Sequence, residues 1–302
     1  NLAEIITPTS GLVYAVNINI EARDTVSLDG KTLLFSLVNA TGEGEAGKVN
    51  IDANNLLVKN GSQLSASSFG RGDAGSVTIS ARDTVSFDGA TTAAFSISGA
   101  GAVGKGGGIN ISTGSLSVTN GAFLSSSTLG QGDAGVVSID ARDRVIFDGV
   151  GTNGLNSAAR SLVLSEAVGN GGEIRINTGL LSLSNGADLE VSTAGKGNAG
   201  NIIINARDTV TFDGISTSGI NSAARSRVTR TAEGNGGNFI VNACSLNLRD
   251  SAQLVSLTTG KGNAGNVTIN ISGLVDFVGV ENRFPSGIIS GVGTGVDGNG
   301  GD

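Results

Sequence analysis

The sequence predicts an all-β fold, a parallel β-helix (β-solenoid) in which each coil contributes three short strands. Two repeated sequence motifs, called the first and second phrase below, and the amino-acid composition predict this fold. The first phrase, Ala-Arg-Asp-Thr-Val-Ser-Phe-Asp-Gly, occupies residues 81–89 and returns with substitutions at 22–30, 141–149 and 206–214, and in decayed form at 271–279. The second is a small residue and a glycine followed by alternating apolar residues. Self-similarity of this kind is the signature of a repeat architecture.

The composition favours strands and turns over helices. The 302 residues include 49 Gly, 2 Pro, no Trp and no Met, and only 15% are charged. Such a chain has few good helix formers, while its 38% hydrophobic residues still permit a buried core. The formal net charge of −7 argues against nucleic acid or an anionic membrane surface as a partner. No run of about 18 apolar residues occurs, so we expect no membrane span.

The second phrase marks where each coil begins. Its first apolar residues recur at nine positions: Ile18, Val49, Val77, Ile109, Val137, Ile174, Ile202, Phe239 and Val267. The intervals alternate between a fixed 28 residues and a variable 31, 32 or 37. We call the two kinds the constant coil and the variable coil; the variable coil carries the nonapeptide. Together they form long repeats of about 60–65 residues that start near 18, 77, 137, 202 and 267.

Nine anchors predict nine or ten coils and, at roughly 4.8 Å per coil, a rod of about 45 Å. We interpret residues 1–302 as a single solenoid segment of a longer array. An alternative places three coils of about 20 residues in each long repeat. Two coils are preferred, because the glycine-anchored phrase and the corner described next both occur twice per repeat.

Within a coil, three stretches of alternating apolar residues are each closed by Gly or Asn-Gly, as in residues 108–135. This pattern is typical of half-buried strands between turns. Alignment puts one column of turn residues at a corner, because Gly and Asn tolerate the left-handed conformation. The column consists of Asp29-Gly30, Asn60-Gly61, Asp88-Gly89, Asn120-Gly121, Asp148-Gly149, Asn185-Gly186 and Asp213-Gly214. Asp250-Ser251 breaks it.

The same alignment predicts the core. Large side chains of the variable coils should point inward and alternate with smaller ones of the constant coils, which fills a narrow interior. The large ones are Phe87, Phe147, Phe212 and Phe277, and the smaller ones are Val58, Val118, Leu183 and Leu248.

The strongest candidates for a binding site are the Arg-Asp pairs of the nonapeptide: Arg23-Asp24, Arg82-Asp83, Arg142-Asp143 and Arg207-Asp208. They could form a charged stripe that recognises a glycan or an ion. Repetition at every second coil favours a structural role at an exposed corner instead.

Three further features of the sequence could form sites. Arg71, Gly72 and Asp73 spell an integrin-binding tripeptide, but their counterparts in other coils are ordinary turn residues. Cys244 is the one cysteine and there is no His, which excludes an internal disulfide and argues against zinc. We expect Cys244 to be a partly buried thiol. The acidic corners could bind calcium weakly.

We predict no catalytic, cofactor-binding or metal-binding residue and no enzymatic activity. The acidic residues are repeat positions without a singular cluster of the kind glycosidases use, and without His the common serine triad is absent.

Residues 197–214 (Gly-Asn-Ala-Gly-Asn-Ile-Ile-Ile-Asn-Ala-Arg-Asp-Thr-Val-Thr-Phe-Asp-Gly) and 176–187 (Ile-Asn-Thr-Gly-Leu-Leu-Ser-Leu-Ser-Asn-Gly-Ala) give the chain a resemblance. It resembles the rod region of filamentous haemagglutinin-like exoproteins, in particular the cyanobacterial repeat arrays of this type. The resemblance implies a right-handed β-helix, export by an outer-membrane two-partner secretion transporter, and a role in adhesion, aggregation or extracellular matrix. The Asn-Pro-Asn signatures of that family's secretion domain do not occur in this sequence.

We therefore expect a secreted or cell-surface structural and adhesive rod that displays variable loops at residues 151–159, 215–224 and 281–289. Its expected partners are surface glycans or receptors and, through end-to-end or lateral self-association, other copies of itself, because exposed strand edges template pairing. The alternative is a carbohydrate-binding or carbohydrate-cleaving β-helix.

Overall fold

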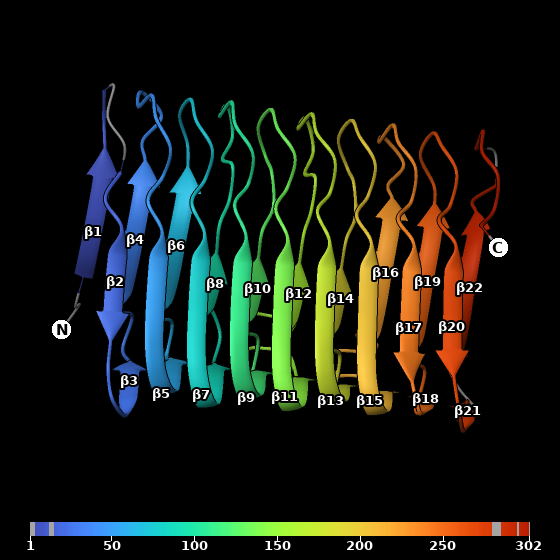
Figure 1. Ribbon diagram of the computed structural model, residues 1–302. Helices are drawn as coiled ribbons and strands as arrows, with labels where there is room; N and C mark the ends of the chain where they lie inside the picture. The colour runs from blue at the N-terminus through green and yellow to red at the C-terminus, as the bar shows by residue number, and fades with distance from the viewer. Residues whose placement is uncertain (1–3, 12–14, 280–284, 295, 302) are drawn as a thin grey trace.

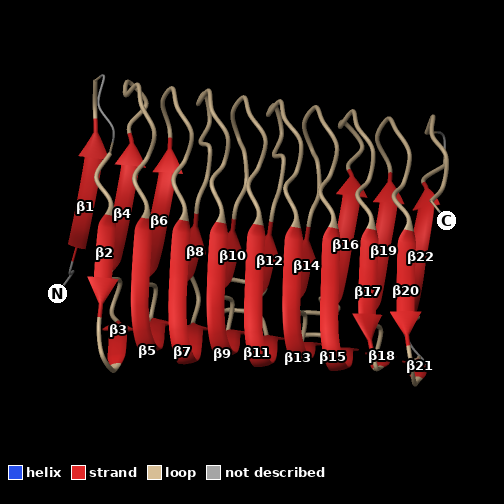
Figure 2. Ribbon diagram, in the orientation of Figure 1, coloured by secondary structure: helices blue, strands red, loops and turns tan. Residues whose placement is uncertain are grey.

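The computed structural model describes residues 4–11, 15–279, 285–294 and 296–301 and has the form of a straight rod (Figure 1). The described residues form strands, turns and loops with no helix (Figure 2). The strands stack in parallel into a β-solenoid of about nine coils, with the two chain ends at opposite ends of the rod. The predicted fold class is confirmed.

Each predicted anchor is the first residue of a strand in one twelve-stranded sheet. Its main path consists of β2 (Ile18–Glu21), β5 (Val49–Lys59), β7 (Val77–Asp88), β9 (Ile109–Thr119), β11 (Val137–Asp148), β13 (Ile174–Ser184), β15 (Ile202–Asp213), β17 (Phe239–Ala243) and β20 (Val267–Ile271). The two-coil assignment is therefore confirmed over the three-coil alternative.

The long strands of the central coils bend in the middle and include the first two of the three predicted stretches. Toward the ends of the rod the second stretch is a separate strand: β3 (Thr25–Leu28), β18 (Ser245–Arg249) and β21 (Val275–Val278). The ladder continues on both sides of the bend, so each half of a long strand still pairs with its equivalents.

The third stretch of every coil lies in a ten-stranded parallel sheet behind the first. Its strands are β1 (Glu4–Thr9), β4 (Leu33–Val38), β6 (Gln63–Ser68), β8 (Ala93–Phe95), β10 (Phe123–Ser125), β12 (Ala158–Arg160), β14 (Asp188–Glu190), β16 (Ala223–Val228), β19 (Gln253–Thr258) and β22 (Gly287–Val292).

The apolar core lies between the two sheets and alternates as predicted. Phe147 pairs with Val118 on one side and Leu183 on the other, and Phe87 and Phe212 are likewise fully buried. Phe277 keeps the register opposite Leu248, but its side chain is 46% exposed. The prediction that Phe277 is buried is wrong, because β21 has a partner strand on one side only among the described residues.

Glycine, serine and small apolar residues such as Val163 fill the other half of the interior, where the chain returns from the ten-stranded sheet to the next long strand. A Cβ on Gly135 would lie 1.8 Å from the carbonyl oxygen of Gly107, which leaves room for glycine alone. Ser161 faces this glycine column: its hydroxyl donates to the Gly135 carbonyl at 2.9 Å and accepts from the Gly172 amide at 2.9 Å. Buried backbone groups in this narrow seam thus obtain partners.

The corner is left-handed, but the predicted column is wrong by one residue in the variable coils: Asp148 pairs with Thr119, so Gly149 lies beside Asn120, and the aspartates of the Asp-Gly pairs do not have positive φ. The extra residue of the bend in each of these coils causes the shift.

The structure also continues the left-handed corner past the break in the sequence. Asn120 and Gly121 have φ of 55° and 84°. The side-chain amide of Asn120 donates a hydrogen bond to the Asp88 carboxylate at 2.7 Å. Asp250 and Ser251 adopt φ of 49° and 68° despite their side chains. The stack therefore imposes the corner on Ser251, a residue type that does not favour it, whereas Asp250 tolerates it.

Replacing Phe147 by Ala should lower the free energy of unfolding by about 3–5 kcal/mol, because it removes a fully buried ring and leaves a cavity. Urea denaturation followed by circular dichroism measures the change. The matched control is Phe277→Ala, which removes the same ring from a half-exposed position and should cost much less. Equal losses in the two variants would contradict the assignment of Phe147 to the core stack.

Replacing Ser251 by Gly should raise the free energy of unfolding by about 1 kcal/mol, since it relieves left-handed strain. It also removes a buried hydroxyl that has no hydrogen-bond partner. The reverse substitution, Gly186→Ser, should destabilise the rod, because Gly186 has φ of 87° and an added Cβ would lie 2.9 Å from the Ile220 carbonyl oxygen. A loss of stability in Ser251→Gly would contradict this account of the corner.

Candidate functional site: the groove at the strand bend

In the variable coils of β7, β11 and β15 the bend is a β-bulge made by the Arg-Asp pair. Ala141 pairs with Thr113 and Arg144 pairs with Ser115, so Arg142 and Asp143 together oppose the single residue Gly114. Gly179 on the other side opposes the same pair. A bulge bends a strand and leaves its extra residue outside the ladder. Both side chains point outward, 62% and 53% exposed, as predicted.

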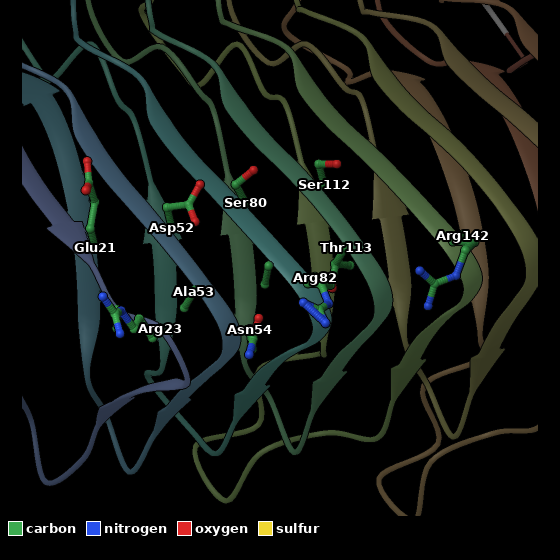
Figure 3. Close-up of a pocket in the computed structure, with 12 residues that line it drawn as sticks. Glu21, Arg23, Asp52, Ala53, Asn54, Ser80, Arg82, Ser112, Thr113 and Arg142 are labelled. Carbon is green, nitrogen blue, oxygen red and sulfur yellow. The ribbon is translucent and has the colours of Figure 1, made fainter.

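Two rows of outward side chains follow the bend along the rod (Figure 3). The row before the bend consists of Glu21, Asp52, Ser80, Ser112, Asp140, Asn177, Asn205, Asn242 and Asn270. The row after the bend contains Arg23, Asn54, Arg82, Arg142 and Arg207, with Gly114, Gly179 and Cys244 in the remaining constant coils. Between the rows lie small side chains: Ala22, Ala53, Ala81, Thr113, Ala141, Thr178, Ala206 and Ala243.

These rows enclose three cavities of 1080, 490 and 560 Å³ in order along the rod. The first and second share Ser112, Thr113 and Arg142, and the second and third share Asn205 and Arg207. The cavities are therefore parts of one longitudinal channel, which we call the bend groove.

The side chains of the row before the bend change from carboxylates near the N-terminus to amides near the C-terminus. Toward the C-terminus its amides form a ladder: Asn205 donates to Asn177 at 2.8 Å and Asn242 to Asn205 at 2.7 Å. Each rung uses one amide N–H and one oxygen lone pair, so further hydrogen-bonding capacity remains. Toward the N-terminus, Glu21 and Asp52 have no side-chain hydrogen bond to any described residue.

The arginines lie along the groove rather than across it. The Arg207 guanidinium donates to the Arg142 carbonyl at 3.0 Å, two coils away, and passes over Gly179. A Cβ on Gly179 would lie 2.6 Å from Arg207 Nη2, and one on Gly114 would lie 2.8 Å from Arg142 Nη2. Glycine in the constant coil thus makes room for the arginine of the next variable coil.

The Arg142–Asp143 pair is bidentate, with Nη2–Oδ2 at 3.0 Å and Nε–Oδ1 at 3.2 Å. The hydrogen bonds from Arg142 lower the pKa of Asp143, and the same bonds raise the pKa of Arg142. Both groups stay charged at neutral pH. By contrast, Arg23 and Arg82 form no ion pair or hydrogen bond through their side chains within the described part of the chain.

Cys244 occupies the position of Gly114 and Gly179 and is exposed. The prediction that it is partly buried is wrong. In the next coil Ser272 and Gly273 stand where the Arg-Asp pair would be, so no guanidinium covers the thiol.

The Arg71-Gly72-Asp73 tripeptide lies in a stacked turn. The Asp73 carboxylate accepts the Lys105 amide at 2.7 Å, as Asp133 accepts the Asn170 amide at 2.8 Å one long repeat later. Gly72 has φ of 135°, and a Cβ there would lie 2.0 Å from the Gly44 carbonyl oxygen. These contacts support the interpretation as an ordinary turn.

The two insertions expected at residues 151–159 and 215–224 are short hairpins next to the corner. Gly151 donates to Leu155 at 2.8 Å, and Ser216 donates to Ile220 at 2.7 Å. The predicted bounds are too wide, because residues 158–159 and 223–224 are buried in β12 and β16. In the third expected loop, residues 281–284 lie outside the described residues and 287–289 belong to β22.

Sequence reasoning missed an ion-pair cluster on the outer face of the ten-stranded sheet. Arg225 contacts Asp188 and also donates to the Asn221 side chain at 2.8 Å, while Arg227 contacts Glu190 at 2.7 Å. Asp188 and Arg225 are almost wholly buried. The available signal was the appearance of charged residues in strand positions that hold Ala, Phe and Ser in earlier coils.

Within the described ranges, no three His, Cys, Asp or Glu side chains gather closely enough to hold a metal ion. No described segment forms a helix able to cross a membrane. The chain matches no protein-family model, and no curated protein or solved structure is detectably similar to it.

Replacing residues 150–156 by the Ala-Thr of residues 90–91 should leave the rod folded, with the free energy of unfolding changed by no more than about 1 kcal/mol. The reason is that the hydrogen bond beyond the hairpin is the same in both coils: Ser157 Oγ accepts the Gly121 amide at 2.9 Å, as Thr92 Oγ1 accepts the Gly61 amide at 2.9 Å. Urea denaturation tests this. Loss of the cooperative transition would show that the hairpin is part of the scaffold.

Proposed function

We propose that the chain is a structural and adhesive rod of a secreted, cell-surface protein of the filamentous haemagglutinin-like kind. The observation that carries the proposal is the separation of a constant stack from variable outer surfaces. Two variable coils are five residues longer than the variable coil that starts at Val77, yet their strands keep the same register. Ser157 and Ser222 close the inserted hairpins with the same hydrogen bond that Thr92 makes without one.

A stack of this kind suits a spacer between surfaces. The described strands of each coil pair only with strands of the two adjacent coils, so the length of the rod grows with the number of coils. Outward side chains repeat in columns, which turns a weak contact at one coil into a multivalent surface along the rod.

The proposal includes the partners that the sequence resemblance implies. An outer-membrane two-partner secretion transporter would export the chain, and parallel stacking of coils, within one chain or between copies, would support aggregation, matrix or filament formation. The alternative function is a carbohydrate-binding or carbohydrate-cleaving β-helix. The bend groove favours the binding part of this alternative, and we assign no reaction to it.

Beads coated with the purified 302-residue chain should aggregate with one another or adhere to cells of the source organism, and antibodies to the chain should label intact cells. Beads coated with albumin are the control. Labelling only after the cells are permeabilised, together with inert beads, would overturn the proposal. A reducing-end assay on neutral and acidic polysaccharides addresses cleavage, and release of new ends would replace the adhesive function with an enzymatic one.

A further inference from the structure

We propose that the bend groove binds a linear, uncharged polysaccharide lying along the rod axis. The inference rests on the proposed adhesive function and names the chemistry of one of its partners. Four observations carry it: the continuity of the groove, its period, its mixture of donors and acceptors, and its charge.

The groove runs through successive coils without a wall across it. The three cavities overlap in their lining residues, and the small side chains between the rows, such as Ala53 and Ala81, leave it open to solvent. A site of this shape accepts an internal segment of a long polymer, whereas a closed pocket accepts only a small molecule or a chain end.

The period of the groove matches a repeating ligand. Arginine recurs at every second coil, Arg82 to Arg142 to Arg207, a spacing of about 10 Å along the rod. This spacing is close to the length of two sugar rings in an extended β-linked chain. Each disaccharide would therefore meet an arginine at the same point as the one before it, opposite a polar side chain of the other row, and weak contacts would add along the chain.

The chemistry of the two rows suits hydroxyl groups. Guanidinium groups only donate hydrogen bonds, carboxylates only accept them, and the Ser80 and Ser112 hydroxyls do both. A sugar hydroxyl both donates and accepts, so it can bridge the rows. Asp52 and Arg82 stand on opposite rows and have no side-chain partner among the described residues, so a ligand need not break an existing bond to reach them.

The charge and polarity of the groove disfavour other polymers. Each groove arginine is followed by an aspartate, such as Asp83 after Arg82, and Glu21 and Asp52 add further carboxylates. The four described arginines that line the groove are thus balanced by three lining carboxylates and by the neighbouring aspartates, so a nucleic acid or an acidic polysaccharide would meet no strong positive field. Ile271 is the only large apolar side chain among the described residues that line the three cavities, so lipid and apolar peptides find little contact.

The test is affinity electrophoresis of the intact chain through gels that contain a neutral β-linked glucan, mannan or xylan, or an alginate of similar size. We expect at least one neutral polymer to retard the chain to the same extent at low and high salt, and oligosaccharides of that polymer to bind more tightly as they lengthen. The double variant Asp52→Ala/Arg82→Ala should bind at least about tenfold more weakly, because both charge-assisted hydrogen bonds are lost.

The matched control is Glu45→Ala/Arg71→Ala, which removes one carboxylate and one guanidinium from exposed turn positions away from the groove. It should bind as the parent does, and both variants should melt at the parent's temperature. Three results would overturn the inference: no retardation by any neutral polymer, salt-sensitive retardation by alginate alone, or equal binding by the groove variant. Beads that adhere to cells while the chain binds no neutral glycan would overturn this inference and leave the rod function standing.

Discussion

The backbone ladder between successive coils is the constraint on which the rest of the rod depends. At a spacing of roughly 4.8 Å, each position of a coil contacts its equivalents in the coils before and after it. A side chain is therefore compatible with the fold only if it stacks on its own column. Amide ladders, alternating Phe and Val, and glycines beneath carbonyl oxygens are three solutions to that one requirement.

Because columns must repeat, much of the fold could be predicted from the sequence. All nine anchors begin strands, and the Phe stack follows from residues such as Phe147. The register of the corner in the variable coils could not be predicted, because the sequence does not show the extra residue that the bend inserts before it. The burial of Cys244 could not be predicted from its own coil, since it depends on a guanidinium that the next coil lacks. The prediction that Phe277 is buried was wrong for a related reason, because burial of its ring needs a neighbouring strand on both sides.

The groove shows the same dependence between coils. The sequence reveals the Arg-Asp pair and its spacing, but not that the pair forms a bulge opposite Gly114 or that Arg207 extends over Gly179. Those contacts join residues tens of positions apart, and an inward or outward column says nothing about the direction a long side chain takes along the rod. The Asp188–Arg225 pair escaped prediction because it belongs to two coils and to no repeated column.

The pairing of Arg142 with Gly114 has a consequence for how such a protein changes length. A variable coil needs a constant coil before it, both to make room for its guanidinium and to place Val118 against Phe147. Loss or gain of a single coil would set arginine on arginine and ring on ring. We therefore expect the stack to accept the gain or loss of coils in units of two, which changes the length of the rod by one long repeat, about 10 Å, at a time.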